Sequence, residues 1–129
     1  MHPAAGLLIA YVSGSFPSAY LAGRLVKGVD LRTVGSGNLG ATNVYRNLGF
    51  AAALSVFALD VAKGALPVWY LPRLLDAGAP GTDRALWWAL AYGMAAILGH
   101  AKPVFLLWKG GGKGVATATG MFVVLAPGA

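Results

Sequence analysis

The sequence lacks cysteine and glutamate altogether, and it has few charged residues of any kind. Without cysteine there can be no disulfide framework, no thiolate metal site and no thiol nucleophile. With two histidines and no glutamate, we also expect no metal-ligand cluster and no cofactor, so any chemistry must come from hydroxyls, amides, bases and backbone groups. Charged residues make up 11% of the 129 residues and hydrophobic residues 57%, which argues against both a soluble domain and a disordered chain.

Long uncharged runs instead predict helices that cross a membrane. Residues 3–23 carry no formal charge and would reach about 31 Å as a helix, which matches the hydrocarbon thickness of a bilayer. The pattern predicts an all-α, polytopic transmembrane helix bundle that forms a single integral membrane domain over residues 1–129. Four spans are expected at about residues 3–24, 47–72, 85–101 and 113–129. A cleaved signal peptide is the alternative for the first run, but no lysine or arginine precedes it and no Ala-x-Ala site follows it.

Two features of the first run predict how it packs. Pro17 is expected to kink the helix. Small residues stand four apart, Gly14 with Ser18 and Ala19 with Gly23, and this spacing lets a second helix approach closely.

The positive charges are divided between two segments. Residues 24–46 carry a net charge of +3, residues 73–84 are neutral, and residues 102–113 carry +3, within a total of +6. By the positive-inside rule, the two basic segments are expected on the cytoplasmic face, and the N-terminus and the neutral loop outside. We therefore expect a lipid bilayer, and not nucleic acid, as the partner of these charges.

The first basic segment has the composition of a phosphate-binding loop. Glycine permits positive φ and lets backbone N–H groups converge on an anion, while serine, asparagine and threonine add donors and arginine can hold a phosphate through two bonds. The candidate residues are Gly35, Ser36, Gly37, Asn38, Gly40, Thr42, Asn43 and Arg46. A flexible connection whose arginines only set the topology is the alternative. The Gly-x-Gly-x-x-Gly spacing also matches a dinucleotide fingerprint, but a membrane span and not a strand comes before it.

The second basic segment places glycines between two lysines, ahead of the last apolar run. Its candidate anion-binding residues are Lys109, Gly110, Gly111, Gly112, Lys113 and Gly114. It is not a Walker A loop, because Gly114 follows Lys113 where serine or threonine is needed, and Leu107 stands where the first glycine is needed. A glycine turn at a helix N-terminus with two ammonium groups is nevertheless suited to an anion. The alternative is that the lysines only anchor helix ends at the interface.

Three further ionisable residues lie in or beside the apolar runs. Asp60 and Lys63 are three residues apart on one expected helix and can pair on one face, either to dock that helix or to act directly. His100 stands where the third run meets the second basic segment and is a candidate for the same binding site. It is either a general base or an interfacial hydrogen-bonding residue.

Residues 13–49, 59–64 and 99–120 resemble the bacterial acyl-phosphate:glycerol-3-phosphate acyltransferase family (PlsY) over nearly the whole chain. The motif Gly-Ser-Gly-Asn-x-Gly-Ala-Thr-Asn-x-x-Arg, residues 35–46, carries the resemblance most specifically. The resemblance implies a multi-pass enzyme of the bacterial plasma (inner) membrane, with seven spans, an external N-terminus and cytoplasmic active-site loops. It also implies transfer of a fatty acyl group from acyl phosphate to the 1-hydroxyl of glycerol 3-phosphate, giving lysophosphatidic acid and phosphate in phospholipid synthesis.

The same resemblance assigns roles to residues. Ser36 and Arg46 take part in catalysis and phosphate handling, Asn38, Thr42 and Asn43 shape the pocket, and residues 109–113 form the glycerol 3-phosphate site. Acyl phosphate is already activated. Positioning two anionic substrates and stabilising the oxyanion and the leaving phosphate can therefore suffice, with a substrate phosphate accepting the hydroxyl proton.

The chain departs from the family pattern in two places. The family motif Lys-Gly-Gly-Lys-Gly has one more glycine here, so either Lys109 or Lys113 is displaced, and Lys113 keeps its register with Gly114. The family's third motif, with His, Asn and Glu, is absent. We therefore expect an N-terminal four-span portion that cannot complete the active site alone. An anion transporter or channel and a small scaffolding membrane protein are the alternative function classes.

Overall fold

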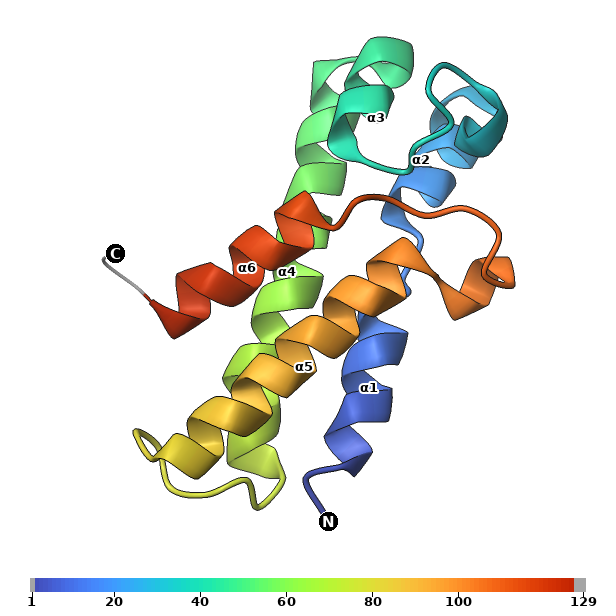
Figure 1. The fold of residues 1–129 in the computed structure, drawn as a ribbon. Helices are drawn as coiled ribbons and strands as arrows, with labels where there is room; N and C mark the ends of the chain where they lie inside the picture. Colours follow the sequence, from blue (N-terminus) through green and yellow to red (C-terminus); the bar gives the residue numbers. More distant parts are fainter. Residues whose placement is uncertain (1, 127–129) are drawn as a thin grey trace.

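The computed structural model describes residues 2–126, and every regular element in that range is a helix (Figure 1). The elements are α1 (Ala5–Gly14), α2 (Ser18–Lys27), the 3-10 helix η1 (Leu31–Thr33), α3 (Ala41–Leu48), α4 (Phe50–Leu74), α5 (Asp83–Ala101), the 3-10 helix η2 (Val104–Leu106) and α6 (Val115–Leu125). The expected all-α fold is therefore confirmed.

The first apolar run is broken where the sequence predicts a kink. Helices α1 and α2 are separated by residues 15–17, and Pro17, which has no N–H group, ends the break. The carbonyl oxygen of Phe16 in this break accepts a hydrogen bond from Nζ of Lys63 at 3.0 Å. This carbonyl also accepts from the backbone N–H of Ser18, so a polar group in the break is satisfied both locally and by a neighbouring helix, as the interior of a membrane requires.

Helices α4 and α5 are the longest elements and form a hairpin (Figure 1). Helix α4 contains Pro67 and Pro72 and continues to Leu74, whereas the sequence predicts its end at residue 72. A proline removes one backbone hydrogen bond, and neighbouring helices in a bundle can hold the chain in helical form despite that loss.

Small residues bring the helix backbones into contact. Gly14 of α1 lies against the carbonyl group of Ala96 in α5, so that a β-carbon on Gly14 would collide with it. Helices α4 and α6 meet in the same way, with Gly64 against the backbone of Thr117. Such contacts are typical of helix association in membranes, and they confirm the predicted close approach at Gly14.

Within residues 2–126, three helical stretches are long and apolar enough to cross a membrane: residues 5–27, 50–74 and 83–106. Helix α6 is apolar but has only 11 residues within the described part of the chain. Many large apolar side chains point outward, among them Leu8, Phe50, Trp87 and Phe122. The four expected spans remain a prediction, and residues 127–129 of the last one lie outside the described residues.

The two glycine-rich segments lie together at one end of the bundle. Figure 1 places the N-terminus and the α4–α5 connection at the opposite end. We call residues 29–40 the first loop and residues 102–114 the second loop. A backbone hydrogen bond from Leu39 to Gly111, 3.2 Å long, joins them directly. The two segments therefore lie on one side of the bundle, and the membrane face that they occupy stays a prediction. One expectation is corrected: residues 41–48 form helix α3 and are not part of a loop.

Candidate phosphate-binding site

A cavity of about 570 Å³ lies between the two loops and the helices that follow them. The start of α3 and the start of α6 both border it, and α4 and α5 each contribute an ionisable side chain. Its lining consists of Ser36, Asn38, Gly40, Ala41, Thr42, Asn43, Arg46, Phe57, Asp60, His100, Lys113, Gly114, Val115 and Ala116. Nine of these residues were expected from the sequence: Ser36, Asn38, Gly40, Thr42, Asn43, Arg46, His100, Lys113 and Gly114.

The first loop is held in shape by the side chain of Asn43. This residue is 3% exposed, and its Nδ2 lies within hydrogen-bond distance of the carbonyl oxygens of Leu31 (3.3 Å), Val34 (3.1 Å) and Asn38 (3.0 Å). Its Oδ1 accepts a bond from the backbone N–H of Ser36 at 3.4 Å. One buried amide on α3 therefore satisfies three backbone carbonyl groups of a loop whose only regular element is the short 3-10 helix η1.

Two glycines of the first loop shape the turn and do not line the cavity. Gly35 and Gly37 have φ angles of +58° and +74°, in the left-handed region. A β-carbon on Gly35 would lie 2.5 Å from Oδ1 of Asn43, and one on Gly37 would lie 2.9 Å from the carbonyl oxygen of Arg32. These two candidates are therefore needed for the path of the chain.

Only some of the residues predicted in the second loop line the cavity. Lys113 and Gly114 line the cavity, whereas Lys109, Gly110, Gly111 and Gly112 do not. The N–H of Gly112 donates to the carbonyl oxygen of His100 at 3.3 Å, and Gly112 packs against the imidazole ring. The lysine that reaches the cavity is thus the one that keeps the family register.

The cavity combines several sources of positive potential. Arg46 and Lys113 line it, and within residues 2–126 neither side chain makes an ion pair or a hydrogen bond. The N-termini of α3 and α6, which have no side-chain caps, also border it. Free backbone N–H groups and the helix dipole favour an anion at such positions. The arrangement is therefore suited to phosphate groups.

Asp60 lines the cavity and forms the predicted pair with Lys63, which is not a lining residue. Asp60 is 1% exposed, and its Oδ1 lies 2.9 Å from Nζ of Lys63 and 2.5 Å from the hydroxyl of Ser18, which donates to it. Nδ1 of His100 lies 3.8 Å from the same oxygen. The prediction that Asp60 and Lys63 pair on one face is confirmed. Because Lys63 compensates the charge of Asp60, the carboxylate does not cancel the cations above it.

Five lining residues were not expected in the site, and one of them, Ala41, lies within the motif of residues 35–46. Asp60 could have been assigned to the site from the sequence, because an ionisable residue inside an apolar span commonly marks function. Phe57, Val115 and Ala116 could not have been, because nothing in the sequence distinguishes them from other apolar residues of the helices.

Ser36 is placed to donate a hydrogen bond. Its Oγ accepts from the backbone N–H of Asn38 at 3.2 Å, and no imidazole or carboxylate of residues 2–126 bonds to it. A serine without a bonded base is suited to stabilising an anion rather than to nucleophilic attack. Within the same residues, no three His, Asp or Glu side chains gather closely enough to hold a metal ion.

Comparisons with known proteins indicate the family of this chain. A family model described as "Glycerol-3-phosphate acyltransferase" matches residues 4–129. Curated relatives with that name include one from Prochlorococcus marinus (strain NATL2A), 48% identical over 92% of this chain, and one from Anaeromyxobacter dehalogenans (strain 2CP-1 / ATCC BAA-258), 50% identical over 94%. The chain covers 56% and 59% of these relatives, so it spans little more than half of their length.

Two solved structures are similar in fold. They are crystal structures of PlsY (YgiH), an integral membrane glycerol 3-phosphate acyltransferase, in its glycerol 3-phosphate and lysophosphatidic acid forms. Their TM-scores are 0.82 and 0.79, at 41% and 38% identity, with 97% of this chain covered and 58% and 57% of theirs. Together with the apolar helices, this likeness identifies the chain as multi-pass and membrane-integral. By sequence and by fold, it belongs to the glycerol-3-phosphate acyltransferase family.

Proposed function

We propose that the natural polypeptide containing this chain transfers a fatty acyl group from acyl phosphate to the 1-hydroxyl of glycerol 3-phosphate, at the cavity between the two loops. One observation carries the proposal. Arg46 and Lys113, unpaired within the described residues, line one cavity together with two uncapped helix N-termini. Both substrates carry a phosphate group, and such groups bind well to guanidinium, ammonium and free N–H donors.

The proposed chemistry requires positioning rather than a protein nucleophile. The 1-hydroxyl oxygen attacks the acyl carbonyl carbon, the bond from that carbon to the phosphate oxygen breaks, and inorganic phosphate leaves. The hydroxyl proton passes to a phosphate oxygen of a substrate. Arg46 and Lys113 hold the phosphates, while Ser36 and the first N–H groups of α3 donate to the charge that develops during transfer. Asn38 and Thr42 complete the same wall of the cavity.

The apolar lining suits the acyl group. Phe57, Val115 and Ala116 lie in the same cavity as the cations, and the first two are exposed on the outer surface of the bundle. An acyl chain that enters from the bilayer would therefore meet apolar side chains beside the phosphate site.

We place both loops on the cytoplasmic side of the bacterial inner membrane, and the N-terminus outside. The two basic segments carry +3 each, and the α4–α5 connection is neutral. Because the chain has no cysteine, single cysteines can be introduced as labels. A membrane-impermeant maleimide added to spheroplasts is expected to label Asp76→Cys and not Lys27→Cys, and the reverse pattern would overturn the orientation.

A reconstitution assay tests the activity itself. In detergent, the polypeptide is expected to release inorganic phosphate only when acyl phosphate and glycerol 3-phosphate are both present, and to form labelled lysophosphatidic acid. A transporter would instead move phosphate across sealed vesicles without consuming acyl phosphate. Absence of the product with both substrates present would overturn the proposed function.

Variants then test the site. Arg46→Lys keeps the charge but loses the planar fork, and Ser36→Ala loses the hydroxyl, so each is expected to lower turnover by about 100-fold. Arg73→Lys is the matched control, because Arg73 lies over the ring of Trp69 at the other end of the bundle. Turnover of Arg46→Lys within a few-fold of the parent would make Arg46 a topology anchor only.

A further inference from the structure

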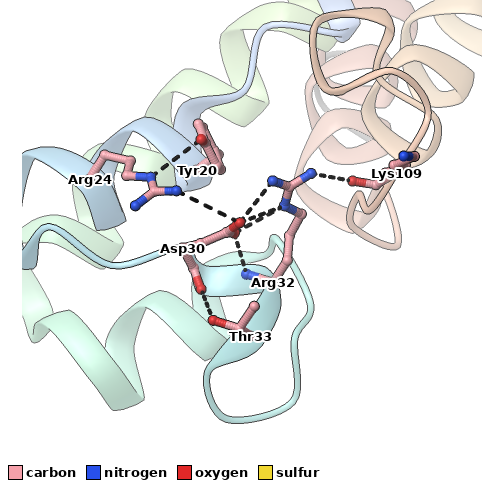
Figure 2. Close-up of polar contacts among 6 residues, drawn as sticks. All are labelled: Tyr20, Arg24, Asp30, Arg32, Thr33 and Lys109. Atoms are coloured by element: carbon pink, nitrogen blue, oxygen red, sulfur yellow. Dashed lines mark hydrogen bonds and ion pairs between the residues drawn. The ribbon is translucent and has the colours of Figure 1, made fainter.

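One side chain, that of Arg32, connects the two loops. Figure 2 shows its guanidinium between Asp30 of the first loop and the backbone of Lys109 in the second. Nε and Nη2 donate to the carboxylate of Asp30, with Nη2 2.8 Å from Oδ2, and Nη1 donates to the carbonyl oxygen of Lys109 at 2.8 Å. Arg32 does not line the cavity. It can therefore affect the cavity only through the loops that it joins.

On the side of the first loop, Arg32 is fixed by several contacts. Asp30 accepts the guanidinium through both carboxylate oxygens and the backbone N–H of Arg32 at 3.0 Å. The Arg32 guanidinium also lies 5.0 Å from the centroid of the Tyr20 ring. Hydrogen bonding to Arg32 holds the pKa of Asp30 below its usual range, so the carboxylate is charged near neutral pH.

On the side of the second loop, the backbone depends on outside support. Residues 109–114 contain four glycines and two lysines, and the lysine side chains have no hydrogen-bond partner in the described part of the chain. Gly110, at φ +97°, packs so closely on Arg32 that a β-carbon would lie 2.6 Å from Cδ. The bonds from Arg32 to Lys109 and from Leu39 to Gly111 therefore fix the start of the glycine run.

We infer that Arg32 is a positioning residue that holds the glycine run of the second loop so that Lys113 meets the phosphate of glycerol 3-phosphate. Lys113 stands four residues after the carbonyl that Arg32 holds, and flexible glycines separate them. The inference rests on the proposed function for its substrate. If Arg32 is lost, the run gains conformational freedom that the substrate must then remove on binding.

The test compares Arg32→Lys with Arg24→Lys in the full natural polypeptide. Arg24 is the matched control, since it also lies over Tyr20, at 5.4 Å, and 4.0 Å from Asp30, but makes no bond to the second loop. Arg32→Lys is expected to raise KM for glycerol 3-phosphate about tenfold. Its kcat and its KM for acyl phosphate should stay within about twofold of the control, and its melting temperature within a few degrees. A parallel fall of kcat, both affinities and stability would reduce Arg32 to a structural residue and overturn the inference.

Hydrogen exchange of residues 104–115 supplies a readout that needs no catalysis. Exchange there is expected to be faster in Arg32→Lys and unchanged in Arg24→Lys, whereas exchange of residues 50–74 is expected to be equal in both. Equal exchange of the second loop in all three proteins would overturn the inference. If the parent protein formed no lysophosphatidic acid, the proposed function would fail, and loop exchange would still decide whether Arg32 positions the loop.

Discussion

The two glycine-rich loops border the same cavity but are stabilised in different ways. The first is held by the helix that directly follows it, because Asn43 of α3 binds three of its carbonyl groups. In the second, residues 102–109 form turn bonds among themselves and bond to Ser15 and Tyr11, whereas the glycine run is held by Arg32, Leu39 and His100 from other parts of the chain. A glycine-rich sequence can therefore be rigid or compliant, depending on where its hydrogen-bond partners stand.

Asp60→Asn should destabilise the helices that carry both loops, because Asp60 of α4 binds Ser18 of α2 and Lys63 and lies 3.8 Å from His100 of α5. The variant leaves Lys63 buried without a counter-charge, so we expect a loss of about 4 kcal/mol in the free energy of unfolding. Unfolding in mixed micelles measures this, with exposed Asp76→Asn as the control, expected within about 0.5 kcal/mol of the parent. The double variant Asp60→Asn/Lys63→Met should recover much of the loss, and equal stability of Asp60→Asn and its control would contradict the prediction.

Asn43→Asp should break the first loop and spare the second. Aspartate has nearly the same shape, but its carboxylate cannot donate to the carbonyl oxygens of Leu31, Val34 and Asn38, so we expect a loss of about 3 kcal/mol. Hydrogen exchange should accelerate in residues 31–40 more than in residues 109–114. Asn47→Asp is the control on the same helix, since Asn47 lies outside the cavity and bonds only to Asn43. Equal acceleration in both loops would show that the first is not self-supported.

Gly112→Ala should act on the second loop alone. A β-carbon at this position would collide with Nε2 of His100, and we expect a cost of about 2 kcal/mol together with weaker binding of inorganic phosphate. Gly28→Ala is the comparison, because Gly28 has φ +64° and open space around its Cα, so it reports backbone strain without a collision. Calorimetric titration with phosphate measures the binding. If the two variants bound phosphate with equal affinity, Gly112 would have no role in holding the site in shape.

Much of the site was predictable because its residues are concentrated in the sequence. The motif of residues 35–46 places donors and an arginine within one short segment, and the positive-inside rule groups it with Lys113. Helix periodicity likewise predicts that Asp60 and Lys63 meet, because residues three apart share a face.

The remaining features depend on contacts between distant residues. The bond from Arg32 to Lys109 joins positions 77 apart, and no local pattern indicates it. Helix α3 was missed since it has neither an apolar run nor a side-chain cap at its start. Gly35 and Gly37 were expected around the anion, but the turn needs them for its left-handed backbone. Composition thus indicates which groups are available, and tertiary packing decides which of them reach the cavity.

Asp30→Asn is the mildest way to weaken the support of the second loop. The pKa of Asp30 is lowered by its hydrogen bonds to Arg32. Its contribution to stability is therefore complete at any pH above the ordinary aspartate pKa of about 3.9, and it is lost as the pH falls through the lower pKa of the folded state. The pair is partly exposed, with 18% of the Asp30 side chain and 26% of the Arg32 side chain accessible, so we expect less than about 1 kcal/mol at pH 7.

The difference in unfolding free energy between the parent and Asp30→Asn should stay constant from pH 5 to pH 8 and shrink below about pH 4. Hydrogen exchange, compared at matched intrinsic rates, should show that residues 109–114 loosen before residues 34–40 over the same acid range, because Arg32 fixes the start of the glycine run whereas Asn43 holds the carbonyl groups of Val34 and Asn38. A difference that changes between pH 6 and pH 8 would point to another titrating group. Asn43 carries no titrating proton, so its bonds to the first loop should persist while the Asp30 carboxylate is neutralised. If the first loop loosened ahead of the second, the first would be the less firmly held of the two.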